Sequence, residues 1–408
     1  MSRLLLLVIP FFLHAESLKS ILEFATQNSD LVISKKYTQE SKSKYVQARE
    51  GAYYPTLDLG AFYQTLQEKT PMLAGDTYSG YATLAYDIYD GGKRSALLDK
   101  SINEHKASSY DTKSIQNSIS LKIVELFFNI KSLEDTLDAR DEAKKSLDEQ
   151  LTRMKRFVLA KVATKDDVDR LQAAYDTNIY EMESIKLEIL TLKKLLELNV
   201  GKQIGILDNS KFIEFKEHEL ELIDSVLSIQ ANKDALIRGA ESIESVYYPH
   251  VRVEDSYSLY GYNRTDAQHP EGLDNQNRLM LTLNMRVFDK GIAVKNKEAL
   301  LIEAQALNTQ LSYSKKEQKM QFDLSLSRIK TAFIKIKSAS SALVSADSAF
   351  EIINKKYDAG IVDNVVYLDA LSSQTTAKAL YKKSLNDLEI AYATYYYYAG
   401  KNLKEFLL

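Results

Sequence analysis

The chain has 408 residues, of which 45% are hydrophobic and 27% charged, with 53 lysines and arginines against 56 aspartates and glutamates. This composition excludes disordered and collagen-like chains, and the near balance of charge excludes a global field that attracts nucleic acid. Cysteine is absent, which excludes disulfide scaffolds, thiol catalysis and cysteine-ligated zinc. The 26 tyrosines favour long half-exposed surfaces or a membrane headgroup belt over a compact core.

The first fifteen residues predict a secretory signal. Arg3 supplies positive charge, residues 4–13 are apolar, and Ala15 ends a cleavage site before Glu16. This apolar run is too short to span a bilayer as a helix, and no other stretch of the sequence is long enough. If the protein lies in a membrane, it must therefore span it as strands.

Proline divides the chain into long segments. The five prolines are Pro10, Pro55, Pro71, Pro249 and Pro270, and most glycines lie near the last four. Because proline breaks helix interiors, the proline-free stretches 72–248 and 271–408 predict very long helices that are interrupted twice.

The two proline-containing windows resemble each other, which indicates a tandem duplication. Tyr53-Tyr54-Pro55 returns as Tyr247-Tyr248-Pro249, and Asp90-Gly91-Gly92 returns as Asp289-Lys290-Gly291. Residues 157–171 align in the same way with residues 357–371. We therefore predict a signal peptide at residues 1–15, a first repeat at 16–205 and a second repeat at 206–408.

Each window alternates apolar and polar residues with the period of a β-strand, as Leu57 and Leu59 alternate with Asp58 and Gly60. The predicted strands are residues 54–66, 78–90, 248–262 and 277–289. Strands of about ten residues with one apolar face are typical of a transmembrane barrel, although a half-buried soluble sheet shows the same alternation. Four strands cannot close a barrel, so membrane-embedded strands must pair with strands of other copies.

Between the windows the apolar residues follow the spacing of coiled-coil helices, and the stretch 93–157 predicts a rod about 100 Å long. The helices are expected to reverse at two tips, residues 157–168 and 357–368. We expect Ala160 and Gly360 to lie in the tip turns, and Thr164 and Asp363 to cap the helices that follow.

These features together resemble the TolC family of outer-membrane efflux proteins. The motifs that carry the resemblance are Tyr54-Pro55 and Tyr248-Pro249 before the hairpins, Gly92 and Gly291 after them, and the tip motif at residues 357–370. The resemblance covers residues 17–401. It implies a mainly α fold with membrane β-structure, in which a duplicated helix-strand-strand-helix repeat forms a trimeric twelve-stranded β-barrel continued by a long periplasmic α-helical barrel.

The resemblance implies a passive outer-membrane channel, the exit duct of a tripartite efflux pump or a type I secretion system. The implied partners are two further copies in a homotrimer, a periplasmic adaptor of the membrane fusion class, an inner-membrane RND, ABC or MFS transporter and outer-membrane lipid. No nucleic acid, cofactor or enzymatic activity is expected, because the five histidines are scattered and catalytic motifs are absent. The alternative is a periplasmic coiled-coil scaffold or adaptor that forms no channel.

Members of this family often carry aspartates that ring the tip entrance. Here Asp369 stands at the second acidic position of the tip motif, while Val366 occupies the first. We hypothesise that Asp369, together with Asp169, Asp166 and Asp363, forms acidic rings that favour cations and hold the tip partly shut. The alternative is that these carboxylates cap and solubilise the starts of helices, where they suit the helix dipole.

Overall fold

The computed structural model describes residues 16–68, 74–213, 215–263 and 272–408. The predicted signal peptide, Pro71 and Pro270 lie outside the described residues. In chain order the elements are α1 (Leu18–Asn28), α2 (Asp30–Gly51), β1 (Thr56–Thr65), β2 (Asp76–Tyr89), α3 (Lys93–Leu159), α4 (Lys165–Val200), α5 (Asp224–Glu244), the short 3₁₀ helix η1 (Ser245–Tyr247), β3 (His250–Asn263), β4 (Asn275–Asn284), α6 (Ile292–Asp358), α7 (Asn364–Tyr398) and η2 (Leu403–Phe406).

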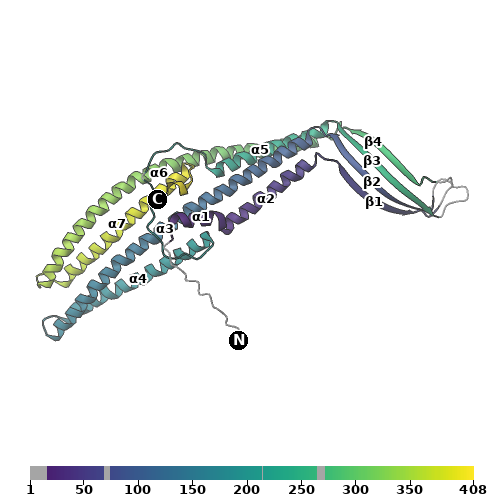
Figure 1. The fold of residues 1–408 in the computed structure, drawn as a ribbon. Helices are drawn as coiled ribbons and strands as arrows, with labels where there is room; N and C mark the ends of the chain where they lie inside the picture. The colour runs from purple at the N-terminus through teal and green to yellow at the C-terminus, as the bar shows by residue number, and fades with distance from the viewer. Residues whose placement is uncertain (1–15, 69–73, 214, 264–271) are drawn as a thin grey trace, which may run out of the picture. The chain divides into compact units, whose positions relative to one another are not determined.

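The four strands form one antiparallel sheet in the order β1-β2-β3-β4 (Figure 1). Its register places Leu57 opposite Leu84, so the apolar residues of β1 and β2 share one face. That face carries Leu57, Leu59, Leu84, Val251, Val253, Leu279, Leu281 and Leu283. The opposite face carries Asp58, Thr83, Asp87, Arg252, Glu254, Ser256 and Arg278. The first face is thus mainly apolar, with Asp255 opposite Leu84 and Leu279 as an acidic exception, and the second face is mainly polar.

Strand β4 ends at Asn284, before the end at residue 289 that alternation alone suggests. Asn284 pairs with His250, which is the first residue of β3. Residues 285–289 therefore continue past the start of β3 and pair with no strand in the described part of the chain. Sequence alternation persists there, but a strand also needs a partner for its backbone groups.

The chain folds as two compact units. The first comprises residues up to Lys36, Thr112–Asp224 and Ser314–Leu408, and the second comprises Tyr37–Asp111 and Ser225–Tyr313. Each unit contains parts of both predicted sequence repeats. The helices α3 and α6 have 67 residues each. Among the described helices, none combines the length and the apolar composition needed to cross a membrane.

The core of the first unit is built around α1 and rings from the end of α7. Leu18, Ile21 and Leu22 follow helical spacing and are fully buried. Tyr395 and Tyr396 are fully buried as well. These two tyrosines thus differ from the half-exposed surfaces that the tyrosine-rich composition favours, because their rings pack on neighbouring aromatic rings. The Tyr395 hydroxyl also accepts a hydrogen bond from the His218 backbone N–H at 2.6 Å.

The segment 207–213, at the start of the second predicted repeat, holds both ends of the described chain. Glu16 forms a parallel bridge with Leu207, and Leu407 forms an antiparallel bridge with Phe212. The Phe212 N–H also donates to the Glu389 carboxylate at 2.8 Å, and burial raises the pKa of Glu389. This segment thus ties together elements from the two repeats within the first unit.

Candidate functional site

The first helical tip joins α3 to α4 within the first unit. Helix α3 ends at Leu159, and α4 begins after a capping box at Thr164. The Thr164 N–H donates to the Asp167 carboxylate at 3.2 Å, and the Asp167 N–H donates to the Thr164 hydroxyl at 3.4 Å. The Asp167 carboxylate is therefore engaged in the capping box that begins α4.

The second tip joins α6 to α7 in the same unit. Asp363 is the N-cap of α7, and its carboxylate accepts a hydrogen bond from the Val366 N–H at 3.0 Å. Asn364 is buried, and its side-chain amide donates to the Asp167 carbonyl at 3.2 Å. That hydrogen bond connects the two tips directly.

A small aromatic core and one ion pair hold the tips together. The rings of Tyr357 and Tyr367 stack with centroids 4.7 Å apart, and both side chains are buried against Leu151 and Leu171. Burial raises the pKa of both tyrosines, so they stay neutral at physiological pH. Arg153 on α3 pairs with the Asp358 carboxylate, and its second guanidinium nitrogen donates to the Asp358 carbonyl at 2.8 Å.

The structure places the four predicted entrance aspartates in two different situations. Asp363 caps α7, and Asp166 pairs with Arg170 at 2.9 Å, so both have local partners. Asp169 and Asp369 are exposed near the starts of α4 and α7, and neither makes an ion pair within the described part of the chain. They are therefore the two tip carboxylates that are not engaged locally.

Both tip turns use the same backbone geometry. The αL residue is Gly360 in the second tip, with φ of 72°, and Lys161 in the first, with φ of 61°. The Lys161 and Gly360 N–H groups donate to the carbonyls of Val158 and Tyr357, three residues back. The N–H groups of the next residues, Val162 and Ile361, donate to carbonyls five residues back. Ala160, which the sequence predicts for this turn, lies in it directly before the left-handed residue Lys161.

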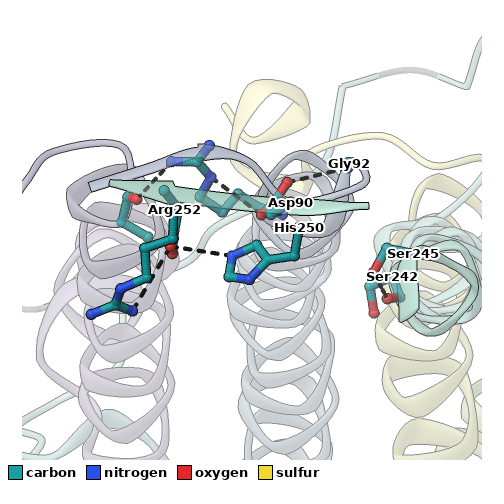
Figure 2. A network of polar contacts seen from close by, with 9 residues as sticks. Asp90, Gly92, Ser242, Ser245, His250 and Arg252 are labelled. Carbon is teal, nitrogen blue, oxygen red and sulfur yellow. Dashed lines mark hydrogen bonds and ion pairs between the residues drawn. The ribbon is translucent and has the colours of Figure 1, made fainter. Parts of the chain in front are cut away.

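The first strand-to-helix junction, in the second unit, is organised by Asp90. Its carboxylate accepts hydrogen bonds from the N–H groups of Gly92 (3.2 Å) and Arg94 (2.8 Å), as Figure 2 shows for Asp90 and Gly92. Gly91 and Gly92 both have positive φ. A Cβ on Gly91 would lie 2.7 Å from the Ser245 carbonyl oxygen, so this turn also packs closely against η1.

The second junction repeats this arrangement with Asp289. Its carboxylate accepts from the N–H groups of Gly291 (2.9 Å) and Ala293 (3.0 Å), and also from the Tyr247 hydroxyl (2.7 Å). These contacts hold the pKa of Asp289 below its ordinary value, with the Tyr247 hydrogen bond as the largest cause. The Asp-x-Gly motifs therefore direct the chain from strand to helix.

The Tyr-Pro motifs precede the strands at both junctions. Pro55 comes directly before β1 and Pro249 directly before β3, and the preceding tyrosines, Tyr54 and Tyr248, are exposed. Nearby on the polar face, His250 Nε2 lies 3.2 Å from Asp87 and Arg252 lies 3.8 Å from it. Figure 2 shows His250 and Arg252 close to the first junction. Both side chains thus lie within reach of the Asp87 carboxylate on the polar face of the sheet.

The contacts found at the tips and junctions are structural ones, ion pairs and hydrogen bonds that hold elements together. No group of three or more histidine, aspartate or glutamate side chains in the described ranges is placed to hold a metal ion. The residues that sequence reasoning missed are Arg153, which pairs across 205 positions, and Asn364, which bonds across 197. No local motif marks either residue, because each finds its partner only when the two tips pack together.

Comparison with known proteins agrees with this architecture. The family model described as outer membrane efflux protein matches residues 22–183 of this chain. This match confirms the predicted resemblance. No curated protein matches the sequence.

Solved structures share the fold along most of the chain. The outer membrane channel CmeC of Campylobacter jejuni is similar with a TM-score of 0.84 and 14% identity, over 94% of this chain and 85% of that one. The outer membrane protein VceC of Vibrio cholerae gives a TM-score of 0.81 and 13% identity, over 95% and 96%. The open-state channel MtrE of Neisseria gonorrhoeae gives 0.76 and 12%, over 95% and 89%. The predicted fold class is thereby confirmed.

Proposed function

We propose that this chain is one of three identical subunits of a passive outer-membrane channel, the exit duct for an efflux pump or secretion system powered at the inner membrane. The match of residues 22–183 to the outer membrane efflux protein family model and the fold shared with outer-membrane channels support the proposal. In this proposal the sheet lies in the outer membrane, the long helices extend into the periplasm, and the chain has no catalytic role.

The observation that carries the proposal is the unfinished sheet. Its outer strands β1 and β4 each pair on one side only, and unpaired edges are not stable in lipid. On the apolar face, Leu59 and Leu279 are 80% and 73% exposed, which is costly in water and favourable in a bilayer. Three copies bring twelve strands together, so that each β4 pairs with a neighbouring β1 and the polar faces line the lumen.

The long helix α6 also favours association with further copies. Large apolar side chains stay exposed along it, including Tyr313 (66%), Ile334 (67%) and Val344 (67%). Large apolar side chains that recur in exposed positions along one long helix favour a protein–protein contact there. We propose that neighbouring subunits cover it in the homotrimer, and that outer-membrane lipid covers the apolar face of the sheet.

The tips form the entrance in this proposal. Arg153 with Asp358, and the stacked Tyr357 and Tyr367, keep the two tips of a subunit together. Asp369, and with it Asp169, would then give threefold rings of unpaired carboxylates that favour cations. Asp166 and Asp363 contribute less, because their charges are engaged locally. A periplasmic adaptor and an inner-membrane RND, ABC or MFS transporter would open this entrance.

The test is planar-bilayer recording of the detergent-purified protein. Wild type is expected to give small cation-selective steps, and Asp369→Ala is expected to lower cation selectivity and enlarge the steps. The matched control is Asp363→Ser, which removes a tip charge but keeps an N-cap, and it should change both properties little. Unchanged selectivity in Asp369→Ala would rule out the acidic ring. A protein that stays in solution without detergent and gives no conductance would contradict the channel itself.

A further inference from the structure

The two tip turns share a backbone but differ in charge. Lys161 in the first tip stands where the second has Gly360, and both are the αL residue of the same hydrogen-bonded turn. Lys165 is the first residue of α4, and Asn364 is the first residue of α7. At these two equivalent positions, the first tip therefore carries two positive charges that the second tip lacks.

Lys161 occupies a position that local structure does not favour for lysine. Its φ of 61° lies in the left-handed region, which glycine adopts readily and other residues rarely do. Its side chain is exposed and makes no ion pair in the described part of the chain. Gly360 shows that the same turn forms with the residue that local structure prefers. A strained residue without a local contact is a reason to look for an external one.

Lys165 is also placed against its local preference. Cations destabilise the first turn of a helix, where the dipole is positive, and Lys165 opens α4. Its side chain is exposed, and no ion pair is found for it among the described residues. Lys155 and Arg156 differ in this respect, because they lie in the last turn of α3, where the dipole favours cations. Lys161 has no such local explanation, and Lys165 has only the exposed carboxylates of its own helix nearby, Asp166 beside it and Asp169 four residues on.

Two exposed apolar side chains belong to the same tip segment as these lysines. Leu159 is 84% exposed and Val162 is 72% exposed. Together, Leu159, Lys161, Val162 and Lys165 form what we call the first-tip surface. An apolar centre with charges beside it has the composition of a protein-binding patch, in which the charges select the partner and the apolar groups contribute affinity.

We propose that the first-tip surface docks an acidic protein segment, with carboxylates that meet Lys161 and Lys165 and apolar side chains that meet Leu159 and Val162. The inference rests on the proposed function and gives the chemistry of the periplasmic partner at this tip. A protein fits better than an anionic membrane, because Asp166, Asp167 and Asp169 follow within the same turns of α4. An extended anionic surface meets those carboxylates as well, whereas a small protein segment can place its charges against the lysines alone.

The test uses the full-length protein in its native host, with the photo-crosslinker p-benzoylphenylalanine at position 162. Position 361 in the second tip is the matched control, because Ile361 is 70% exposed at the equivalent place. The crosslinked partner peptide is identified by mass spectrometry. The expected result is that the crosslinker at position 162 captures a partner segment with net negative charge. A neutral or basic segment there, or no protein product, would overturn the proposal.

A swap variant, Lys161→Gly with Lys165→Asn, separates docking from folding by giving the first tip the residues of the second. Its thermal midpoint should equal or exceed that of wild type, because both substitutions remove local strain. Its crosslinking yield at position 162 should fall about fivefold or more, because the charges that select the partner are lost. Lys356→Gln, at the end of α6, should leave the yield unchanged. An undiminished yield in the swap variant would refute the role of the lysines.

Two further measurements separate the alternatives. Sedimentation with vesicles of three parts neutral and one part anionic phospholipid should show no dependence on Lys161 and Lys165. If lysine-dependent vesicle binding appears instead of a protein crosslink, the membrane interpretation replaces ours. Conductance of the swap variant in planar bilayers should match wild type. Loss of the crosslink in the swap variant, with normal conductance in both wild type and variant, supports docking. Absent conductance in wild type argues against the proposed channel, and the crosslinking result is then judged separately.

Discussion

The two strand-to-helix junctions form the same hydrogen-bonded backbone turn, but different side chains support it. In both, an aspartate accepts hydrogen bonds from two backbone N–H groups of the following turn. At the first junction the same aspartate, Asp90, is paired with Arg94 at 3.2 Å. At the second, the equivalent of Arg94 is Ala293, and the Tyr247 hydroxyl bonds to Asp289 instead. The two junctions therefore share the turn, whereas the contact that supports it differs.

The junctions also differ in why glycine is needed. The first has Gly91 and Gly92 at positive φ, and the second has Lys290 and Gly291. Gly91 lies against η1, whereas a Cβ on Gly291 would meet no atom within 4 Å. Packing therefore demands glycine at the first position of the first junction, and backbone conformation alone favours it at the second junction.

Gly91→Ala should give the largest effect. The new Cβ would lie 2.7 Å from both the Ser245 carbonyl oxygen and the Tyr248 Cβ, in addition to the strain of positive φ. We expect a loss of about 3 kcal/mol of unfolding free energy. Gly291→Ala is the matched control and should cost only about 1 kcal/mol, because it adds φ strain without a clash. Chemical unfolding followed by circular dichroism measures both. Equal losses would show that the contact with η1 does not constrain the first junction.

Arg94→Ala should give the next largest effect. The Arg94 guanidinium pairs with Asp90, donates to the Ala52 carbonyl at 3.3 Å and lies 5.1 Å from the centre of the Tyr53 ring. Alanine copies the residue found at the second junction, but Tyr53 is stacked on the guanidinium and is not bonded to Asp90. We expect a loss of about 1–2 kcal/mol, measured as above. If the variant is as stable as wild type, the two supporting contacts are interchangeable without further change.

Tyr247→Phe should reveal a pH-dependent contribution that only the second junction has. The pKa of Asp289 is lowered, chiefly by the Tyr247 hydroxyl, so the ionised carboxylate stabilises the folded state above the ordinary aspartate pKa of about 3.9. That stabilisation is lost as pH falls through the lowered value. The thermal midpoint of the variant should thus lie below wild type at pH 5–7, and the gap should narrow below about pH 4. In Tyr53→Phe, which keeps the ring on Arg94, a gap of this kind should be absent.

The fold could be predicted from the sequence because its causes are local and repeated. Proline windows mark the ends of the helices, and the alternation around Leu57 and Leu84 places both residues on one face of the sheet. The tips were less predictable. Lys161 adopts a left-handed backbone conformation that lysine rarely adopts, so the residue type does not predict it. The pairing of Arg153 with Asp358 depends on how two distant helix ends pack. Sequence patterns identify the elements, whereas long-range contacts arise only from their packing.

Lys290→Gly should give the smallest effect, and in the opposite direction. Lys290 has φ of 56° and an exposed side chain, so its conformation carries strain without an evident contact that compensates for it. Glycine relieves that strain but has a more flexible unfolded chain, so the net gain should be about 0.5–1 kcal/mol. The substitution would give the second junction the same Gly-Gly pair as the first. A loss of stability would instead show that the Lys290 side chain makes a contact in the assembled protein, and native mass spectrometry of the variant would show whether subunit association had weakened.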